Sequence, residues 1–180
     1  MNDISLHILD IAQNSVAARA TCISIRIEED RPADRFLLAI SDNGRGIPED
    51  LLKKVFDPFY TTRTTRSVGL GLSLLAQSAR ETGGDISVES EEGTGTTVTA
   101  HFRPSHIDMK PLGDIADTLL TLIAGNPDID FSFSYGKPGS RYEFATADIR
   151  KELEEVPITS PYVLSWLKDE LKRSLREAIG

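Results

Sequence analysis

The first part of the chain alternates between helical and extended hydrophobic patterns. Apolar residues recur at helical spacing over residues 3–19, which predicts an amphipathic helix. Three isoleucines over residues 23–28 alternate with polar residues, as in a half-buried strand, and the mostly apolar run 36–41 predicts a second, central strand. Pro48 opens a short helix, because proline suits the first helical turn.

A further helix and two strands follow. The helix covers residues 70–82 and ends at two glycines, which favour the backbone conformation that closes a helix. Strands over residues 85–90 and 96–102 are joined by a glycine-containing turn.

The pattern changes after Pro104. A helix is predicted over residues 111–124. Aromatic residues then alternate with polar ones over 131–135 and again over 142–144, which predicts a hairpin with an aromatic face. Two helices close the chain, and the last begins near residue 160.

We place a domain boundary near residues 104–108. It separates an N-terminal domain, residues 1–106, from a small C-terminal helix–hairpin–helix–helix subdomain, residues 107–180. Two interpretations of the subdomain stay open. It completes the core in place of missing N-terminal structure, or it presents a docking surface centred on the last helix and Trp166.

Composition narrows the function classes. The 180 residues suit one domain or one domain with an appendage. A net charge of −8 argues against nucleic-acid and anionic-membrane partners. No apolar run approaches the roughly 18–20 residues of a membrane span, and no secretory signal is visible. The single Cys22 forms no internal disulfide, so a cytoplasmic location is the simplest interpretation.

The first of four candidate clusters lies in the first helix. Asp10 and Asn14 are four residues apart, so they share a helix face. A carboxylate and a carboxamide there could hold a hard cation such as Mg²⁺, which prefers oxygen ligands. The alternative is a solvated polar face.

The second cluster directly follows the strand at 36–41. Asp42 at the strand end could accept a hydrogen bond from an exocyclic amine, while Gly44 and Gly46 permit positive φ and the close approach of a flat ligand. A plain turn is the alternative.

The third and fourth clusters are a long loop and a tight turn. Aromatic residues begin the segment 56–63, and a polar stretch follows it. This stretch ends at Gly69 and Gly71, where a helix begins, and the first backbone amides of a helix favour phosphate oxygens. A surface loop is the alternative. The turn at 93–97 brings Thr96 close to Asp42 in one interpretation and is only a hairpin turn in the other.

In order and spacing, the four clusters resemble the N, G1, F and G2, and G3 boxes of GHKL ATPases. The segment 56–63 resembles the F box of histidine kinases, with Arg63 where lysine is more usual. The segment 68–74 is similar to their G2 box, although Ser67 replaces a common glycine. The first box, residues 13–21, looks closer to mismatch-repair ATPases.

The resemblance covers residues 1 to about 104 and implies a fold and a ligand. The fold is an α/β (α+β) two-layer sandwich, a mixed sheet with helices on one face. The ligand is ATP with Mg²⁺. Asn14 is expected to coordinate the metal. Asp42 is expected to recognise the adenine amine, supported by Gly44, Gly46 and Thr96.

The resemblance also implies a mobile lid over residues 60–69 and a phosphate site built from Arg63, Gly69 and Gly71. Asp10 occupies the place of the glutamate that activates water in gyrase-type members. It is one methylene shorter, so it either acts as the catalytic base or only orients Mg²⁺.

The resemblance begins almost at Met1, and no histidine lies in a phosphoacceptor-like context. We therefore expect a stand-alone module that acts in trans on a separate protein, as a kinase of histidine or serine or as a nucleotide-dependent regulatory switch in signal transduction. The alternatives are a mismatch-repair or gyrase-like ATP clamp, an anti-sigma-factor-type serine kinase and a binding protein without turnover. The oligomeric state and the partner stay open.

Overall fold

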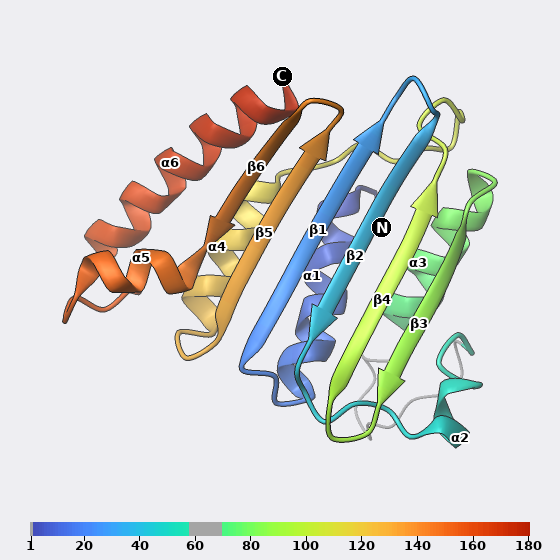
Figure 1. Ribbon diagram of the computed structural model, residues 1–180, viewed down its shortest axis with the longest axis horizontal. Helices are drawn as coiled ribbons and strands as arrows, with labels where there is room; N and C mark the ends of the chain where they lie inside the picture. The colour runs from blue at the N-terminus through green and yellow to red at the C-terminus, as the bar shows by residue number, and fades with distance from the viewer. Residues whose placement is uncertain (1, 58–69) are drawn as a thin grey trace.

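The computed structural model describes residues 2–57 and 70–180 and is built on one mixed sheet (Figure 1). Six strands lie in the order β3-β4-β2-β1-β5-β6. Their bounds are β1 Cys22–Asp30, β2 Arg35–Asp42, β3 Asp85–Glu91, β4 Gly95–Phe102, β5 Asp130–Lys137 and β6 Ser140–Ala145. All neighbouring pairs are antiparallel except β1 and β5, which run parallel.

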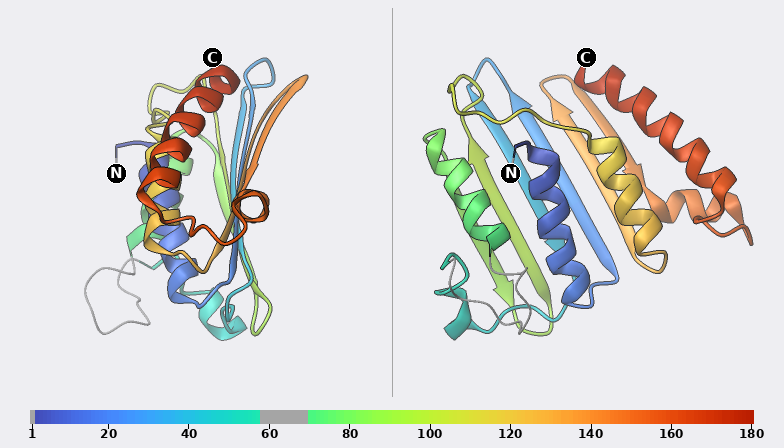
Figure 2. Two further views of the ribbon diagram at one scale, coloured as in Figure 1. Left: turned by 90° about the vertical axis from the view of Figure 1, so that its left-hand side faces the viewer. Right: turned by 180° about the vertical axis from the view of Figure 1, so that it is seen from behind.

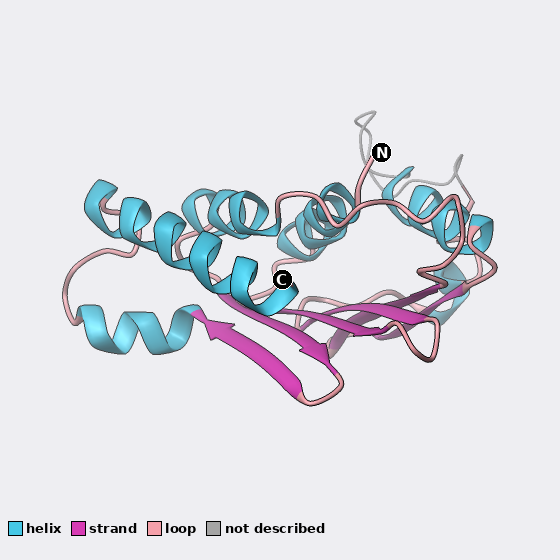
Figure 3. Ribbon diagram, turned by 90° about the horizontal axis from the view of Figure 1, so that it is seen from above, coloured by secondary structure: helices cyan, strands magenta, loops and turns pink. Residues whose placement is uncertain are grey.

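The long helices lie on one face of this sheet (Figures 2 and 3). The helices are α1 Ile4–Ala17, α2 Glu49–Leu52, α3 Leu70–Glu81, α4 Ile115–Gly125, α5 Thr146–Leu153 and α6 Pro161–Ile179. Helices α1, α3, α4 and α6 form the covering layer, whereas α2 and α5 lie at the ends of strands. The predicted two-layer arrangement is therefore confirmed.

The core lies between the two layers, as the alternating pattern requires. Ile23, Ile25 and Ile27 of β1 are fully buried against the helices. The intervening Ser24 and Arg26 are exposed on the open face of the sheet. Each buried isoleucine contributes about 1.5–3 kcal/mol relative to an exposed one, so the two-residue period fixes which face the helices cover.

The C-terminal hairpin extends the same sheet. β5 pairs with β1 from Cys22 opposite Asp130 onward, and β6 pairs with β5 at the edge. Helix α4 packs against α1, and α6 covers α4 and β6. One hydrophobic cluster runs through both parts of the chain. This arrangement agrees with the interpretation that the tail completes the core, while the boundary at residue 106 stays a prediction about independent folding.

One predicted boundary was wrong. The helix expected from residue 111 begins at Ile115, because Asp114 caps it by accepting a hydrogen bond from the Asp117 amide. The carbonyls of Pro111 and Leu112 instead accept 2.9 Å hydrogen bonds from the first amides of α1. Those amides have no partner within their own helix, so the tail completes the start of α1.

Candidate functional site

A polar row crosses the helix-facing side of the sheet at one end. Asp42 on β2, Thr96 on β4 and Ser90 on β3 are direct cross-strand neighbours, so their side chains share one face. The next row on the same side is apolar: Ile40, Val98 and Val88. Polar side chains on a face that is otherwise apolar mark this end of the sheet as a candidate binding floor. We call Asp42, Thr96 and Ser90 the polar row.

Asp42 is held by two donors. The Ser15 hydroxyl on α1 donates to Oδ2 at 2.5 Å, and the Gly44 amide donates to Oδ1 at 2.9 Å. Ser15 is buried, whereas Asp42 is half-buried. A carboxylate oxygen has two lone pairs, so Asp42 keeps acceptor capacity for a further donor.

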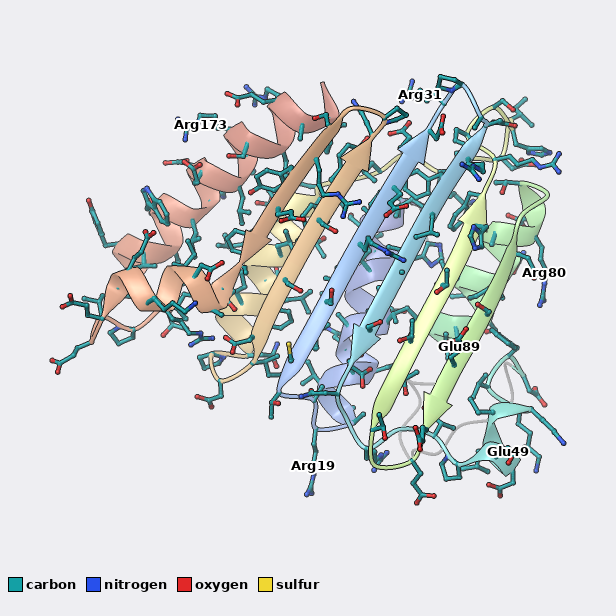
Figure 4. The ribbon with its side chains drawn as sticks, viewed as in Figure 1. Arg19, Arg31, Glu49, Arg80, Glu89 and Arg173 are labelled. Atoms are coloured by element: carbon teal, nitrogen blue, oxygen red, sulfur yellow. The ribbon has the colours of Figure 1, made fainter. Side chains whose placement is uncertain are left out.

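The glycine loop, residues 42–47, is fixed to the turn after α1. The Asn43 carboxamide oxygen accepts 2.9 Å hydrogen bonds from the amides of Thr21 and Cys22, and the Arg45 amide donates to the Ala18 carbonyl at 2.9 Å. Figure 4 shows Arg19 projecting from this turn at the same end of the sheet. Hydrogen bonds within the protein therefore hold this loop in place.

Close contacts with neighbouring backbone atoms leave no room for a side chain at Gly44 or Gly46. Gly46 has φ +69°, and a Cβ there would lie 2.0 Å from the Glu91 carbonyl oxygen. A Cβ on Gly44 would lie 2.8 Å from the Ala18 carbonyl oxygen. The sequence interpretation assigned these glycines to ligand approach, and the structure adds close backbone packing as a second reason.

Asp10 and Asn14 occupy successive turns of α1, as predicted. Both are half-buried, and neither side chain has a hydrogen-bond partner within residues 2–57 and 70–180. Burial raises the pKa of the Asp10 carboxyl above its ordinary value. The start of α3 faces it, since a Cβ on Gly71 would lie 3.3 Å from Asp10 Oδ2.

Helices α1 and α3 are joined by a buried polar contact. His7 Nε2 lies 3.1 Å from Ser78 Oγ, and burial lowers the pKa of His7 to about 4, so the ring is neutral at pH 7. His7 Nδ1 has no hydrogen-bond partner among the described residues. The contact lies one turn before Asp10 on α1, and it helps to set how α3 approaches Asp10.

The third cluster is described only at its beginning and end. Phe56 packs against the core, and the Arg80 guanidinium of α3 lies 5.9 Å from its ring centroid. The aromatic start is thus anchored on α3. Arg63 and Gly69, predicted to bind phosphate, lie outside the described residues, as does the predicted lid over 60–69, so these assignments stay predictions.

The structure thus brings several predicted residues to one end of the molecule. Asp42, Thr96, Gly44 and Gly46 form the polar row and its loop, and Gly71 of α3 faces Asp10 of α1.

Sequence analysis missed Ser15 and Ser90 as site residues. Ser15 follows Asn14 directly, so its helix position could have suggested it, whereas Ser90 needed the strand register.

A separate hollow of about 440 Å³ lies at the other end of the sheet and is lined by residues of β1, β2, β4 and the β5–β6 hairpin. Four of its charged side chains form two ion pairs: Arg141 lies 3.4 Å from Glu28, and Arg35 lies 3.8 Å from Asp30. These four ions neutralise one another, so they do not favour a charged ligand.

Known proteins resemble this chain over the same region. Residues 2–106 match the family described as histidine kinase-, DNA gyrase B- and HSP90-like ATPases. The chain belongs to this family. Since the match covers more than half of the chain and includes the polar row, the glycine loop and α1, the site described above lies within the ATPase-like domain.

Relatives of this ATPase-like domain include bacterial sensor kinases. The chain is 42% identical over 83 residues to Sensor kinase CckA of Brucella abortus (strain 2308), which covers 46% of this chain and 9% of that protein. It is 39% identical over 100 residues to the signal transduction histidine-protein kinase AtoS of Escherichia coli (strain K12), covering 55% of this chain and 16% of that protein. The chain thus spans only a small part of these relatives.

The fold also resembles a solved structure described as the N-terminal domain of a DNA repair protein. The TM-score is 0.57 at 18% identity, covering 79% of this chain and 52% of that one. At this identity the likeness concerns the fold alone. Within the described ranges, 2–57 and 70–180, no helix has both the length and the apolar character needed to cross a membrane.

Proposed function

We propose that this chain is a histidine-kinase-like module that binds ATP with Mg²⁺ and acts in trans on a separate protein. The observation that carries the proposal is the polar row. An aspartate held by Ser15 and by its own glycine loop, with acceptor capacity left, lies within an ATPase-like domain.

The base would lie against the polar row. Asp42 would accept a hydrogen bond from the exocyclic amine of adenine, and Thr96 on the neighbouring strand would support it. The tethered glycine loop keeps Asp42 in place, which lowers the ordering cost of binding.

Asn14 fits a role as a metal ligand. In residues 2–57 and 70–180, no three His, Cys, Asp or Glu side chains gather closely enough to hold a metal ion. A magnesium ion carried by a nucleotide needs no such group, because Mg²⁺ keeps several waters and takes one or two protein oxygens. The Asn14 carboxamide, which has no hydrogen-bond partner among the described residues, would supply one such oxygen. The missing side chain at Gly71 leaves room beside the neighbouring Asp10. When bound, Mg²⁺ would neutralise charge on the phosphate oxygens.

The start of α3 would receive the phosphates. Gly71 lies in the first turn of this helix, where backbone amides and the helix dipole favour anions. Arg63 and Gly69 are proposed to complete this phosphate site.

Asp10 is the candidate catalytic base. Its raised pKa makes it a better proton acceptor than an exposed aspartate, and it faces the start of α3 where the phosphates would lie. In this role it would take a proton from an attacking water or hydroxyl oxygen as that oxygen bonds to the γ-phosphorus of ATP, while the bond from that phosphorus to the β,γ-bridging oxygen breaks and ADP leaves.

The partner is proposed to be a protein. The matched relatives are named as sensor and signal-transduction kinases, which favours phosphoryl transfer or a nucleotide-dependent switch in signalling. A cytoplasmic location is part of this proposal. The acceptor, histidine or serine, stays open. A DNA-repair-type ATP clamp is less favoured, because the net charge of −8 opposes DNA contact.

Titration calorimetry tests the binding step. ADP and a non-hydrolysable ATP analogue should bind with saturation in the presence of Mg²⁺, and Asp42→Asn should weaken both. Adenine nucleotides that fail to bind the folded wild-type protein would refute the proposal. Incubation with [γ-³²P]ATP and candidate proteins then separates a kinase, which labels its partner, from a switch, which does not.

A further inference from the structure

The Ser90 hydroxyl joins the glycine loop to the strand pair beside it. It lies 2.8 Å from the Ile47 amide nitrogen at the end of the loop, 2.9 Å from the Gly95 carbonyl oxygen and 2.8 Å from Thr96 Oγ1. One side chain therefore has three partners: Thr96, which belongs to the polar row, and the backbone groups of Ile47 and Gly95 next to it.

The chemistry of these partners sets the direction of each hydrogen bond. A hydroxyl has one hydrogen and two acceptor lone pairs. The Ile47 amide only donates and the Gly95 carbonyl only accepts. Ser90 therefore donates to Gly95 and accepts from Ile47, and its remaining lone pair accepts from Thr96. The single hydrogen of Thr96 is used in this contact, so Thr96 offers only lone pairs to a ligand.

Asp42, directly opposite Thr96, also offers only acceptors. Its carboxylate already accepts hydrogen bonds from the Ser15 hydroxyl and the Gly44 amide, and an ionised carboxylate has no hydrogen to donate. Cross-strand neighbours have Cβ atoms about 4.5–5.5 Å apart, so one small group can reach both residues. This part of the floor is therefore a pair of acceptors without a donor.

We infer that Ser90 is a specificity-determining residue that selects purines with an amino group at C6 over purines with a carbonyl there. The inference rests on the proposed nucleotide site and deepens it. An exocyclic amine brings two hydrogens to two acceptors. A carbonyl oxygen would face the same acceptors with no hydrogen between them, and buried polar groups without partners weaken binding.

Ser90 acts here through Thr96. Without the Ser90 hydroxyl, the Thr96 hydroxyl would be free to rotate and donate to a carbonyl oxygen. Ser90→Ala should therefore lower the preference for the amino purine. If Ser90 only supported the glycine loop, its loss would instead weaken the binding of both purines by the same factor. The ratio of the two affinities therefore separates a role in specificity from a purely structural role.

Calorimetry with ADP and inosine diphosphate in Mg²⁺ tests the inference without any need for turnover. The wild type should bind ADP about 10- to 100-fold more tightly. Ser90→Ala should reduce this ratio about fivefold or more, and the matched control Ser90→Thr, which keeps the hydroxyl, should retain it. An unchanged ratio in Ser90→Ala overturns the inference.

Thr96→Val provides a second, independent variant. It removes the acceptor and should weaken ADP binding while leaving inosine diphosphate binding nearly unchanged. If Ser90→Ala does not fold, an unchanged ratio in Thr96→Val overturns the inference. A folded wild-type protein that binds neither nucleotide refutes the proposed function, whereas a wild type that binds both equally refutes only the specificity assigned to Ser90.

Discussion

Ser15 of α1 donates a 2.5 Å hydrogen bond to Asp42 at the end of β2. This bond links the helix layer to the residue of the sheet that is proposed to bind the adenine base. Ser15→Ala should lower ADP affinity about 5- to 30-fold, because the buried side of Asp42 loses a donor worth about 1–2 kcal/mol. The control is Ser41→Ala. Ser41 precedes Asp42, but its hydroxyl contacts Thr97 on the other face. Equal losses in both variants would contradict a specific role for Ser15.

Gly46 offers a test of the glycine loop. Gly46→Ala combines positive φ with a Cβ 2.0 Å from the Glu91 carbonyl oxygen, whereas Gly93→Ala at φ +81° meets nothing within 4 Å. The control should cost about 1–2 kcal/mol of unfolding free energy. Gly46→Ala should cost more and should also abolish ADP binding. Urea unfolding and calorimetry measure both effects, and similar costs in the two variants would argue against the close packing.

His7 should make stability depend on pH. Its pKa is about 4 in the folded protein and 6.5 in the unfolded chain, so the unfolded state binds more protons as pH falls below 6.5. The free energy of unfolding should therefore decrease from about pH 6.5 down to about pH 4. In urea titrations, the free energy of unfolding of His7→Leu should decrease less over this pH range than that of the wild type. His101→Gln, at an exposed histidine, should behave like the wild type. Parallel curves for wild type and His7→Leu would rule out a buried neutral imidazole.

Substitution of Asp10 should lower ATP turnover with little effect on nucleotide affinity. Asp10→Asn keeps the shape and the space beside Gly71, so ADP affinity should stay within about threefold, while turnover falls about 100-fold or more. Asn14→Ala is the contrasting variant and should weaken Mg²⁺-dependent binding itself. Steady-state phosphate release and calorimetry measure the two effects. Unchanged turnover in Asp10→Asn would remove Asp10 as the base.

The last helix has a buried side and an exposed side that can be tested apart. Leu171 is fully buried in the core, so Leu171→Ala should cost about 2–5 kcal/mol of unfolding free energy. Trp166 is 44% exposed, so Trp166→Ala should change stability little. If the exposed side docks a protein, Trp166→Ala should reduce partner capture in a pull-down while ADP affinity stays unchanged. A large stability loss in Trp166→Ala would contradict this assignment.

Local patterns predicted nearly every element of this fold. The isoleucines of β1 and the glycines after α3 fixed the type and approximate bounds of their elements, because burial and backbone conformation act over a few residues. The start of α4 was missed because Pro111 and Leu112 are used to complete α1, a contact between segments far apart in sequence. A sequence pattern carries no direct sign of such a pairing.

The candidate site also contains residues that local patterns suggest and contacts that depend on the arrangement of the whole sheet. Asp42, Thr96, Asp10 and Asn14 came from motif order together with helix spacing. The role of Ser90 depends on the register between β3 and β4, and register is set by the whole sheet. Single candidate residues could thus be proposed from a motif, whereas the donors and acceptors that contact them required the three-dimensional arrangement.

The parallel pairing of β1 with β5 has a consequence for how the molecule is made on the ribosome. One side of β1 stays without a neighbour until residues 130–137 have been synthesised, although β2 is available early. Closing so long a loop is slow, and a bare strand edge invites pairing with other chains. The nascent chain therefore leaves one edge of β1 open to pairing with other chains until β5 has been synthesised.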